Sequence, residues 1–156
     1  MGVNSLLFVY EILFLLFPLL FLLLFAWYFL NAEFRKGSLK NIKAHYQDIF
    51  VTENSPIETF KAILKFAIQN GYRIDDIDEQ KFSVVLNEKM TLTSYGSLYP
   101  IYVHENAGKT SVNVGVTSKL GKFFLISPIN KKAVTLRLER MVNGVKGAII
   151  AFDTKN

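Results

Sequence analysis

The stretch from residue 98 to residue 116, LYPIYVHENAGKTSVNVGV, alternates apolar and polar side chains on both sides of an Asn-Ala-Gly-Lys sequence at 106–109. Alternation with a period of two is typical of half-buried β-strands, and a short Asn- and Gly-containing connection joins such strands into a hairpin. Pro100 cannot donate a ladder hydrogen bond, so an edge or bulge position is expected for its strand. The stretch predicts an antiparallel hairpin and makes a sheet the centre of the domain.

Residues before and after this hairpin extend the predicted sheet. Tyr72 and Ile74 begin an extended piece, and residues 82–86 are apolar and β-branched. Turn residues separate these segments, so four or more strands joined by short loops form an antiparallel meander. Residues 122–126 are a candidate for one further short strand.

A helix is predicted to precede the sheet. Ser55 is a good helix cap, Pro56 suits the first helical position and Glu58 places an acid in the first turn. Apolar side chains then recur with helical spacing, and Asn70-Gly71 supplies a stop signal. The apolar face comprises Ile57, Phe60, Ile63, Leu64, Ala67 and Ile68.

A second helix is predicted to follow the sheet, with Asn130 as its cap and two glycines, Gly144 and Gly147, weakening its end. Its apolar stripe comprises Val134, Leu138, Met141, Val142, Val145 and Ile149. Helix, antiparallel sheet and helix over residues 55–152 predict a small α+β domain in which one sheet face packs on the helices. This order of elements resembles helix-grip and TATA-binding-protein-like domains, although no motif selects one family.

The chain begins with a strongly apolar stretch. Residues 6–30 contain one charged side chain, Glu11, and one proline, Pro18. As a helix this stretch would be about 37 Å long, longer than a hydrocarbon core of about 30 Å. No Lys or Arg precedes it and no good cleavage site follows it, so it predicts an uncleaved, single-pass signal anchor. A cleaved signal peptide and a shallow re-entrant hairpin are the alternatives.

Basic residues after the apolar stretch set the predicted orientation. Residues 31–54 form a basic juxtamembrane connector, and the positive-inside rule places them and the domain in the cytoplasm, with the N-terminus outside. Glu11 has two interpretations in this arrangement: a carboxylate that reaches the interface, or a polar contact with a helix of another chain.

Catalytic motifs are scarce. The chain has no cysteine and two histidines, His45 and His104, on different predicted elements. Residues 115–123 depart from a P-loop in glycine spacing, and residues 75–79 lack the glycine and the distal glutamate of an EF-hand loop. We therefore expect no enzyme activity, no cofactor and no metal.

Charge divides the chain more clearly than any motif does. Residues 44–108 contain five Lys/Arg and nine Asp/Glu, a net charge of −4, whereas residues 109–156 contain nine and two, a net charge of +7. Basic side chains beside large apolar ones are typical of contact with anionic lipid surfaces. The candidate contact residues are Arg35, Lys36, Lys40, Lys43, Lys119, Lys122, Phe123, Phe124, Lys131 and Lys132. For the two phenylalanines, alternate burial in a strand is the competing interpretation.

These patterns lead to one main functional hypothesis and two alternatives. The main hypothesis is a non-enzymatic, single-pass protein of the cell membrane whose cytoplasmic α+β domain is a binding or scaffolding module. Its expected partners are membrane lipids together with a protein or a second copy of the chain, and nucleic acid is not expected. The first alternative is a lipid or small-ligand binding domain with an apolar pocket between sheet and helix. The second is a hydrolase or transferase whose acids are Asp75, Asp76 or Asp78.

Overall fold

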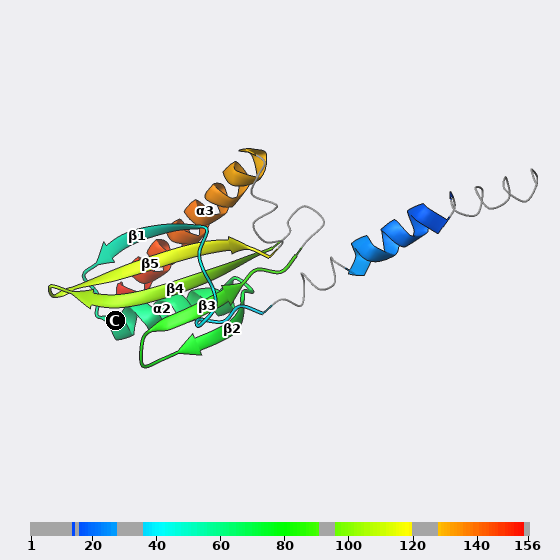
Figure 1. Cartoon of the computed structure of the whole chain (residues 1–156). Helices are drawn as coiled ribbons and strands as arrows, with labels where there is room; N and C mark the ends of the chain where they lie inside the picture. The colour runs from blue at the N-terminus through cyan, green and yellow to red at the C-terminus, as the bar shows by residue number, and fades with distance from the viewer. Residues whose placement is uncertain (1–13, 15, 28–35, 91–95, 120–127, 155–156) are drawn as a thin grey trace, which may run out of the picture. The chain divides into compact units, whose positions relative to one another are not determined.

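The computed structural model describes residues 14, 16–27, 36–90, 96–119 and 128–154. The chain divides into two compact units, Met1–Arg35 and Lys36–Asn156. The second unit contains the whole β-sheet together with helices α2 (Pro56–Gln69) and α3 (Pro128–Asp153) (Figure 1).

The first unit contains a helix over residues 16–27, whose large apolar side chains are all more than half exposed. Among the described residues, no helix combines the length and the apolar character needed to cross a membrane. The prediction of a single-pass signal anchor over 6–30, with an outside N-terminus and a cytoplasmic domain, is therefore wrong. Glu11 and Arg35 lie outside the described residues.

The second unit is a five-stranded antiparallel sheet with these two helices. Its strands are β1 (Tyr46–Thr52), β2 (Arg73–Asp78), β3 (Ser83–Asn87), β4 (Ser97–Asn106) and β5 (Lys109–Ser118); α2 follows β1, and α3 follows β5. The strand order is β1-β5-β4-β3-β2, so the first strand pairs with the last one. The predicted α+β class with an antiparallel sheet is confirmed.

Strand β1 lies inside the stretch that was expected to be a connector, residues 31–54. It pairs antiparallel with β5 along its whole length, from Tyr46 opposite Val116 to Thr52 opposite Thr110. Apolar side chains occur on both faces of β1, because Phe50 faces the core while Ile49 and Val51 are exposed. This removes the alternation by which a strand is recognised. The folded unit therefore begins near Lys36 rather than at residue 55.

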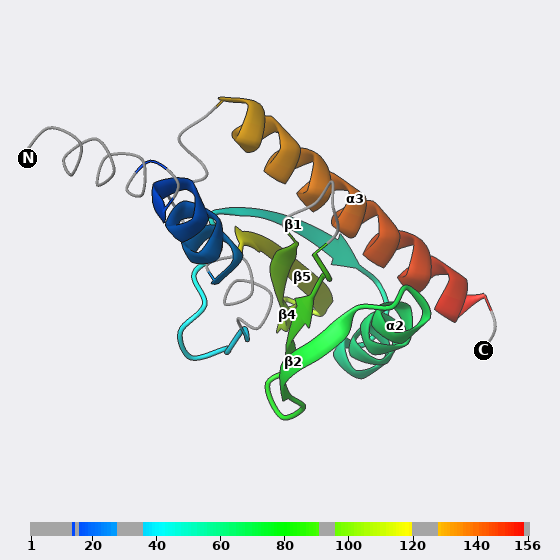
Figure 2. The ribbon, with the colours of Figure 1, turned by 90° about the vertical axis from the view of Figure 1, so that its right-hand side faces the viewer.

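The two faces of the sheet have different neighbours. Strand alternation directs Val112, Val114 and Val116 of β5 toward α2 and α3, which lie on the same side of the sheet (Figure 2). We call this side the inner face and the opposite side the outer face. The predicted apolar residues of the last helix meet the inner face and are at most 6% exposed. Burial of this shared core is the main source of stability.

The helix boundaries follow the local signals closely. Ser55 caps α2 and forms a capping box with Glu58, whose backbone N–H lies 3.3 Å from the Ser55 hydroxyl oxygen. Helix α3 begins at Pro128, two residues before the predicted cap, and continues through Gly144 to Asp153. The ring of Phe66 from α2 occupies the place where a Cβ of Gly144 would lie. Close packing of the two helices explains why this glycine does not end α3.

Candidate functional site

Residues 36–45, which we call the covering segment, lie over part of the outer face. Beneath them, Val85 and Leu98 are 0% and 2% exposed although they point away from the inner face. A Cβ on Gly37 would clash with Val85 Cγ1, so only glycine permits this close approach. At the other end of the segment, His45 Nδ1 lies 2.8 Å from the hydroxyl oxygen of Thr117.

Two neighbouring aspartates attach the covering segment to the sheet. The pairing of β2 with β3 shifts register between Ile74 and Asp76, so Asp75 is the extra residue of a bulge. Asp75 Oδ2 accepts the backbone N–H of Gly37, and Asp76 Oδ2 accepts that of Leu39, both at 2.8 Å. The bulge allows two consecutive carboxylates to bind one segment.

Asp75 is the more completely enclosed of the two carboxylates, with a side chain only 1% exposed. Besides Gly37 it accepts hydrogen bonds from Arg73 Nε at 2.7 Å and from Asn87 Nδ2 at 2.6 Å. Burial by itself raises the pKa of this carboxyl, but the hydrogen bonds from Gly37, Arg73 and Asn87, with the Arg73 charge, lower the pKa below its ordinary value. Asp75 therefore has the environment of a structural carboxylate rather than of a catalytic acid.

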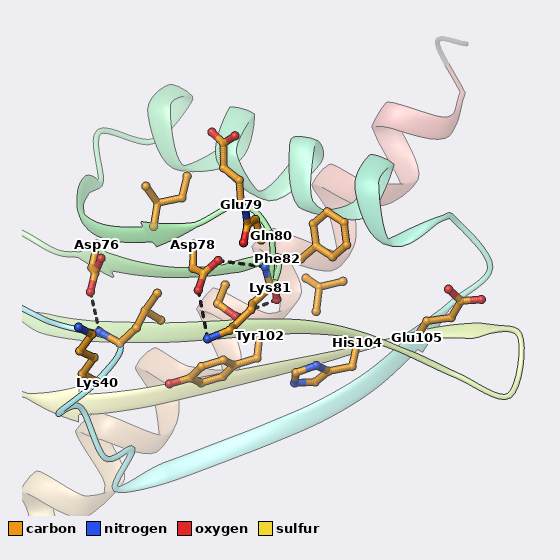
Figure 3. A pocket seen from close by; sticks show the side chains of 14 residues that line it. Lys40, Asp76, Asp78, Glu79, Gln80, Lys81, Phe82, Tyr102, His104 and Glu105 are labelled. Atoms are coloured by element: carbon orange, nitrogen blue, oxygen red, sulfur yellow. Dashed lines mark hydrogen bonds and ion pairs between the residues drawn. The ribbon is translucent and has the colours of Figure 1, made fainter.

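The uncovered part of the outer face forms an open groove of about 930 Å³, which we call the outer groove. Leu39 and Lys40 of the covering segment form one end, and residues 76–83 of β2 and the β2–β3 turn form one side. Residues 102–105 of β4 supply the remaining lining. Figure 3 shows this groove, with Lys40, Asp76 and Asp78 on the side of the covering segment.

Two aromatic rings line the groove on β4. Tyr102 and His104 are two residues apart on one strand and therefore share a face of the sheet. Their ring centroids are 6.3 Å apart and their planes differ by 5°. Figure 3 shows the two rings side by side. Partial burial raises the pKa of the Tyr102 phenol, so this hydroxyl stays protonated near neutral pH.

A salt bridge lies beside these rings, on the side of the groove formed by β2 and the β2–β3 turn. Lys81 Nζ lies 3.6 Å from Asp78 Oδ2, and the backbone N–H of Lys81 donates to Asp78 Oδ1 at 3.0 Å. The Lys81 side chain is 80% exposed. An ion pair this open to water is weak, so a ligand can replace it at little cost.

The described members of the basic set occupy different elements. Lys36, Lys40 and Lys43 are exposed on the covering segment, and Lys131 and Lys132 are exposed at the start of α3. Of these, Lys40 lines the outer groove. Lys119 is 2% exposed, which corrects its assignment as a surface contact. Lys122, Phe123 and Phe124 lie outside the described residues, as does the candidate strand at 122–126.

The acids proposed for hydrolase chemistry have other contacts. Asp75 and Asp76 hold the covering segment, and Asp78 pairs with Lys81. Within the part of the chain that the structure describes, no three His, Cys, Asp or Glu side chains are grouped to hold a metal ion.

Tyr102, Lys81 and Ser83 were not among the site residues predicted from the sequence. Alternation along the strand places Tyr102 on the same face as Pro100 and His104. This alternation was the one feature of the sequence that could have indicated Tyr102 as a site residue. The position of the β2–β3 turn beside that face follows from strand pairing, in which Ser83 lies opposite Tyr102. A single sequence does not state that pairing.

Comparison with known proteins gives a structural relationship only. No family model matches the chain, and no curated protein matches it. The solved structure titled "Crystal structure of Ara h 8.0201" matches with a TM-score of 0.52 and 11% identity. The match covers 68% of this chain and 97% of that one. That structure has a Bet v 1-like fold. At this level of identity the likeness concerns the fold alone.

Proposed function

We propose that the unit from Lys36 to the C-terminus is a non-enzymatic domain that binds a small molecule in the outer groove. The observation that carries the proposal is the groove itself. Its volume of about 930 Å³ falls within the range of about 300–1,000 Å³ that small-molecule sites occupy. It combines a pair of aromatic rings with six charged side chains, so it can offer a ligand both stacking and electrostatic contacts.

The fold supports the same proposal. The Bet v 1-like fold is a ligand-binding fold, which favours the small-ligand hypothesis over a scaffolding module. The buried hydrogen bonds of Asp75 hold the covering segment and leave the groove beside it open. A rigid frame beside an open, ring-lined surface is suited to binding, because the protein then loses little conformational entropy when a ligand binds.

A second location for a ligand is the interface between the sheet and α3, as the sequence hypothesis of an apolar pocket placed it. The likeness in fold favours this candidate too. The side chains that fill the described part of this interface include Met141 and Val145, which are 1% and 0% exposed. An apolar ligand there has to displace such side chains, whereas the outer groove is already open. The outer groove is therefore our first choice.

Fluorescent probes test the proposal on the full chain. We expect at least one of three probes, proflavine, 1-anilinonaphthalene-8-sulfonate (ANS) and 11-dansylaminoundecanoic acid, to bind saturably at one site. Tyr102→Ala removes the larger ring and should weaken that binding by about fivefold or more. Asn143→Ala, at an exposed position of α3, is the matched control and should leave it unchanged.

Two results overturn the groove proposal. Binding that ignores Tyr102→Ala but is lost in Val145→Trp would place the ligand between the sheet and α3. Failure of all three probes to bind saturably, with the chain folded by circular dichroism, would reject small-molecule binding altogether.

A further inference from the structure

We propose that the outer groove selects planar ring compounds that carry a positive charge. This inference rests on the proposed function and specifies its ligand class. It follows from the arrangement of the two rings, the sign of the charges around them and the contacts that those charges already make.

The rings of Tyr102 and His104 offer a flat surface to a ligand. Their planes are near-parallel, so one planar molecule can lie parallel to both rings (Figure 3). Stacked or edge-on aromatic contacts are favourable beyond the apolar area that they bury. A flat ring therefore fits this surface better than a branched or flexible chain does.

The charges that line the groove are mostly negative. Four carboxylates, from Asp76, Asp78, Glu79 and Glu105, are accompanied by two ammonium groups, from Lys40 and Lys81. In a groove, an excess of one sign of charge raises the local concentration of ligands of the opposite charge. The balance favours a cation and disfavours an anionic ligand such as a phosphate ester or a fatty acid.

The existing contacts leave acceptor capacity for such a cation. Asp76 uses one of its carboxylate oxygens for Leu39, and Asp78 is bound to Lys81 only through an exposed ion pair and a backbone hydrogen bond. Among the described residues, the Glu105 carboxylate has no hydrogen-bond or ion-pair partner, and Glu105 directly follows His104 on β4. Because neighbouring residues of a strand point to opposite faces, Glu105 is turned away from the rings and adds negative charge at the edge of the groove, whereas Asp78 lies on the ring side.

The two features reinforce each other for a cationic ring. A positive charge over the face of Tyr102 is attracted by the electron density of the ring, and a ligand ammonium can replace Lys81 as the partner of Asp78. An uncharged apolar ligand gains only the stacking contacts with the rings, and an anion is repelled by the carboxylates. The outer groove therefore discriminates by charge as well as by shape.

Equilibrium titrations of the full chain with two aromatic probes of opposite charge test the inference. Proflavine is a planar cation and ANS is an aromatic anion. We expect proflavine to bind about tenfold or more tightly than ANS, with an affinity that falls as the salt concentration rises. The double variant Asp78→Asn/Glu105→Gln should weaken proflavine by about fivefold or more and leave ANS unchanged or tighter.

Ring chemistry is tested by a matched pair. Tyr102→Leu should weaken proflavine about two- to fivefold, whereas Tyr102→Phe, which keeps the ring, should retain the affinity. Glu139→Gln removes an exposed carboxylate of α3 and controls for net charge. Circular dichroism and the unfolding midpoint of each variant establish that it folds.

The outcomes separate the inference from the proposed function. Equal binding of the two probes, or an unchanged proflavine affinity in the double variant, overturns the charge preference while small-molecule binding stands. Absence of saturable binding by either probe and by the dansylated fatty acid overturns both. A proflavine affinity that falls equally in Glu139→Gln shows a general charge effect and also overturns the inference.

Discussion

Individual carboxylates account for much of the local geometry around the outer groove. Asp75 is enclosed and accepts three hydrogen bonds, and its neighbour Asp76 is joined to the covering segment while lining the groove. In the sequence they form one acidic cluster and look equivalent. Only the bulge in β2 gives them separate partners, so their roles become visible in the folded chain.

Replacing Asp75 by Asn should reduce the free energy of unfolding by about 1–3 kcal/mol at pH 7, because a buried acceptor of three hydrogen bonds is lost. The folded pKa of Asp75 is lower than that of an unfolded aspartate, about 3.9. Its stabilisation is therefore complete above that pH and is lost as the pH falls through the folded value. Urea unfolding at pH 7 and pH 3 should show a large difference between parent and variant that shrinks on acidification.

The exposed Asp153→Asn is the control for this experiment and should follow the parent at both pH values. A difference between Asp75→Asn and the parent that stays constant from pH 7 to pH 3 would contradict the structural assignment of this carboxylate.

The secondary-structure elements differ in how their edges are protected. Strand β2 at one edge has a bulge and three aspartates, which discourage pairing with another chain. Strand β1 at the other edge exposes Ile49 and Val51, at 56% and 57%. Its one charged residue, Asp48, accepts the Ile49 backbone N–H at 2.8 Å through Oδ1. Asp48 thus takes up the Ile49 N–H, which an additional strand would need for pairing with β1.

Asp48→Val should make the chain associate through β1. The substitution frees the Ile49 N–H and removes the one charge of β1, whose Ile49 and Val51 are already exposed, so antiparallel pairing of two β1 strands becomes favourable. Sedimentation velocity over a range of concentrations should show dimers or larger species. Glu139→Val makes a similar chemical change on α3 and should sediment as the parent does; identical behaviour of the two variants would refute a protective role for Asp48.

At the scale of the whole molecule, the sheet is completed by its first strand. β1 pairs with β5, the last strand among the described residues, and its Tyr46 and Phe50 pack against the core. The covering segment protects Val85 and Leu98 on the opposite face. The unit therefore depends on residues that sequence analysis assigned to a connector.

A chain that begins at residue 36 should fold, and a chain that begins at residue 55 should not. The shorter chain lacks β1 and the covering segment, so one edge of β5 and the apolar side chains of the outer face lose their partners. Circular dichroism and thermal unfolding of 36–156 and 55–156 check this. A cooperative transition at the same midpoint in both chains would show that β1 is dispensable.

Local signals in the sequence determined the elements whose residues repeat with one clear period. The capping box at Ser55 and Glu58 and the six-residue stripe of α3 set the helices, and alternation at 98–116 set the central hairpin. The capping box reflects contacts between residues close in the chain. The helix stripe and the strand alternation each reflect one buried face of an element. They were sufficient for the α+β class, the antiparallel sheet and the identity of the inner core.

Tertiary structure alone decided the position of β1, the role of Asp75 and the existence of the outer groove. β1 carries apolar residues on both faces, the two aspartates differ only through a bulge, and Tyr102 meets the β2–β3 turn through strand pairing. All three depend on contacts between residues far apart in the chain. The apolar pattern at 6–30 led to the prediction of a membrane span, whereas among the described residues no helix is long and apolar enough to cross a membrane.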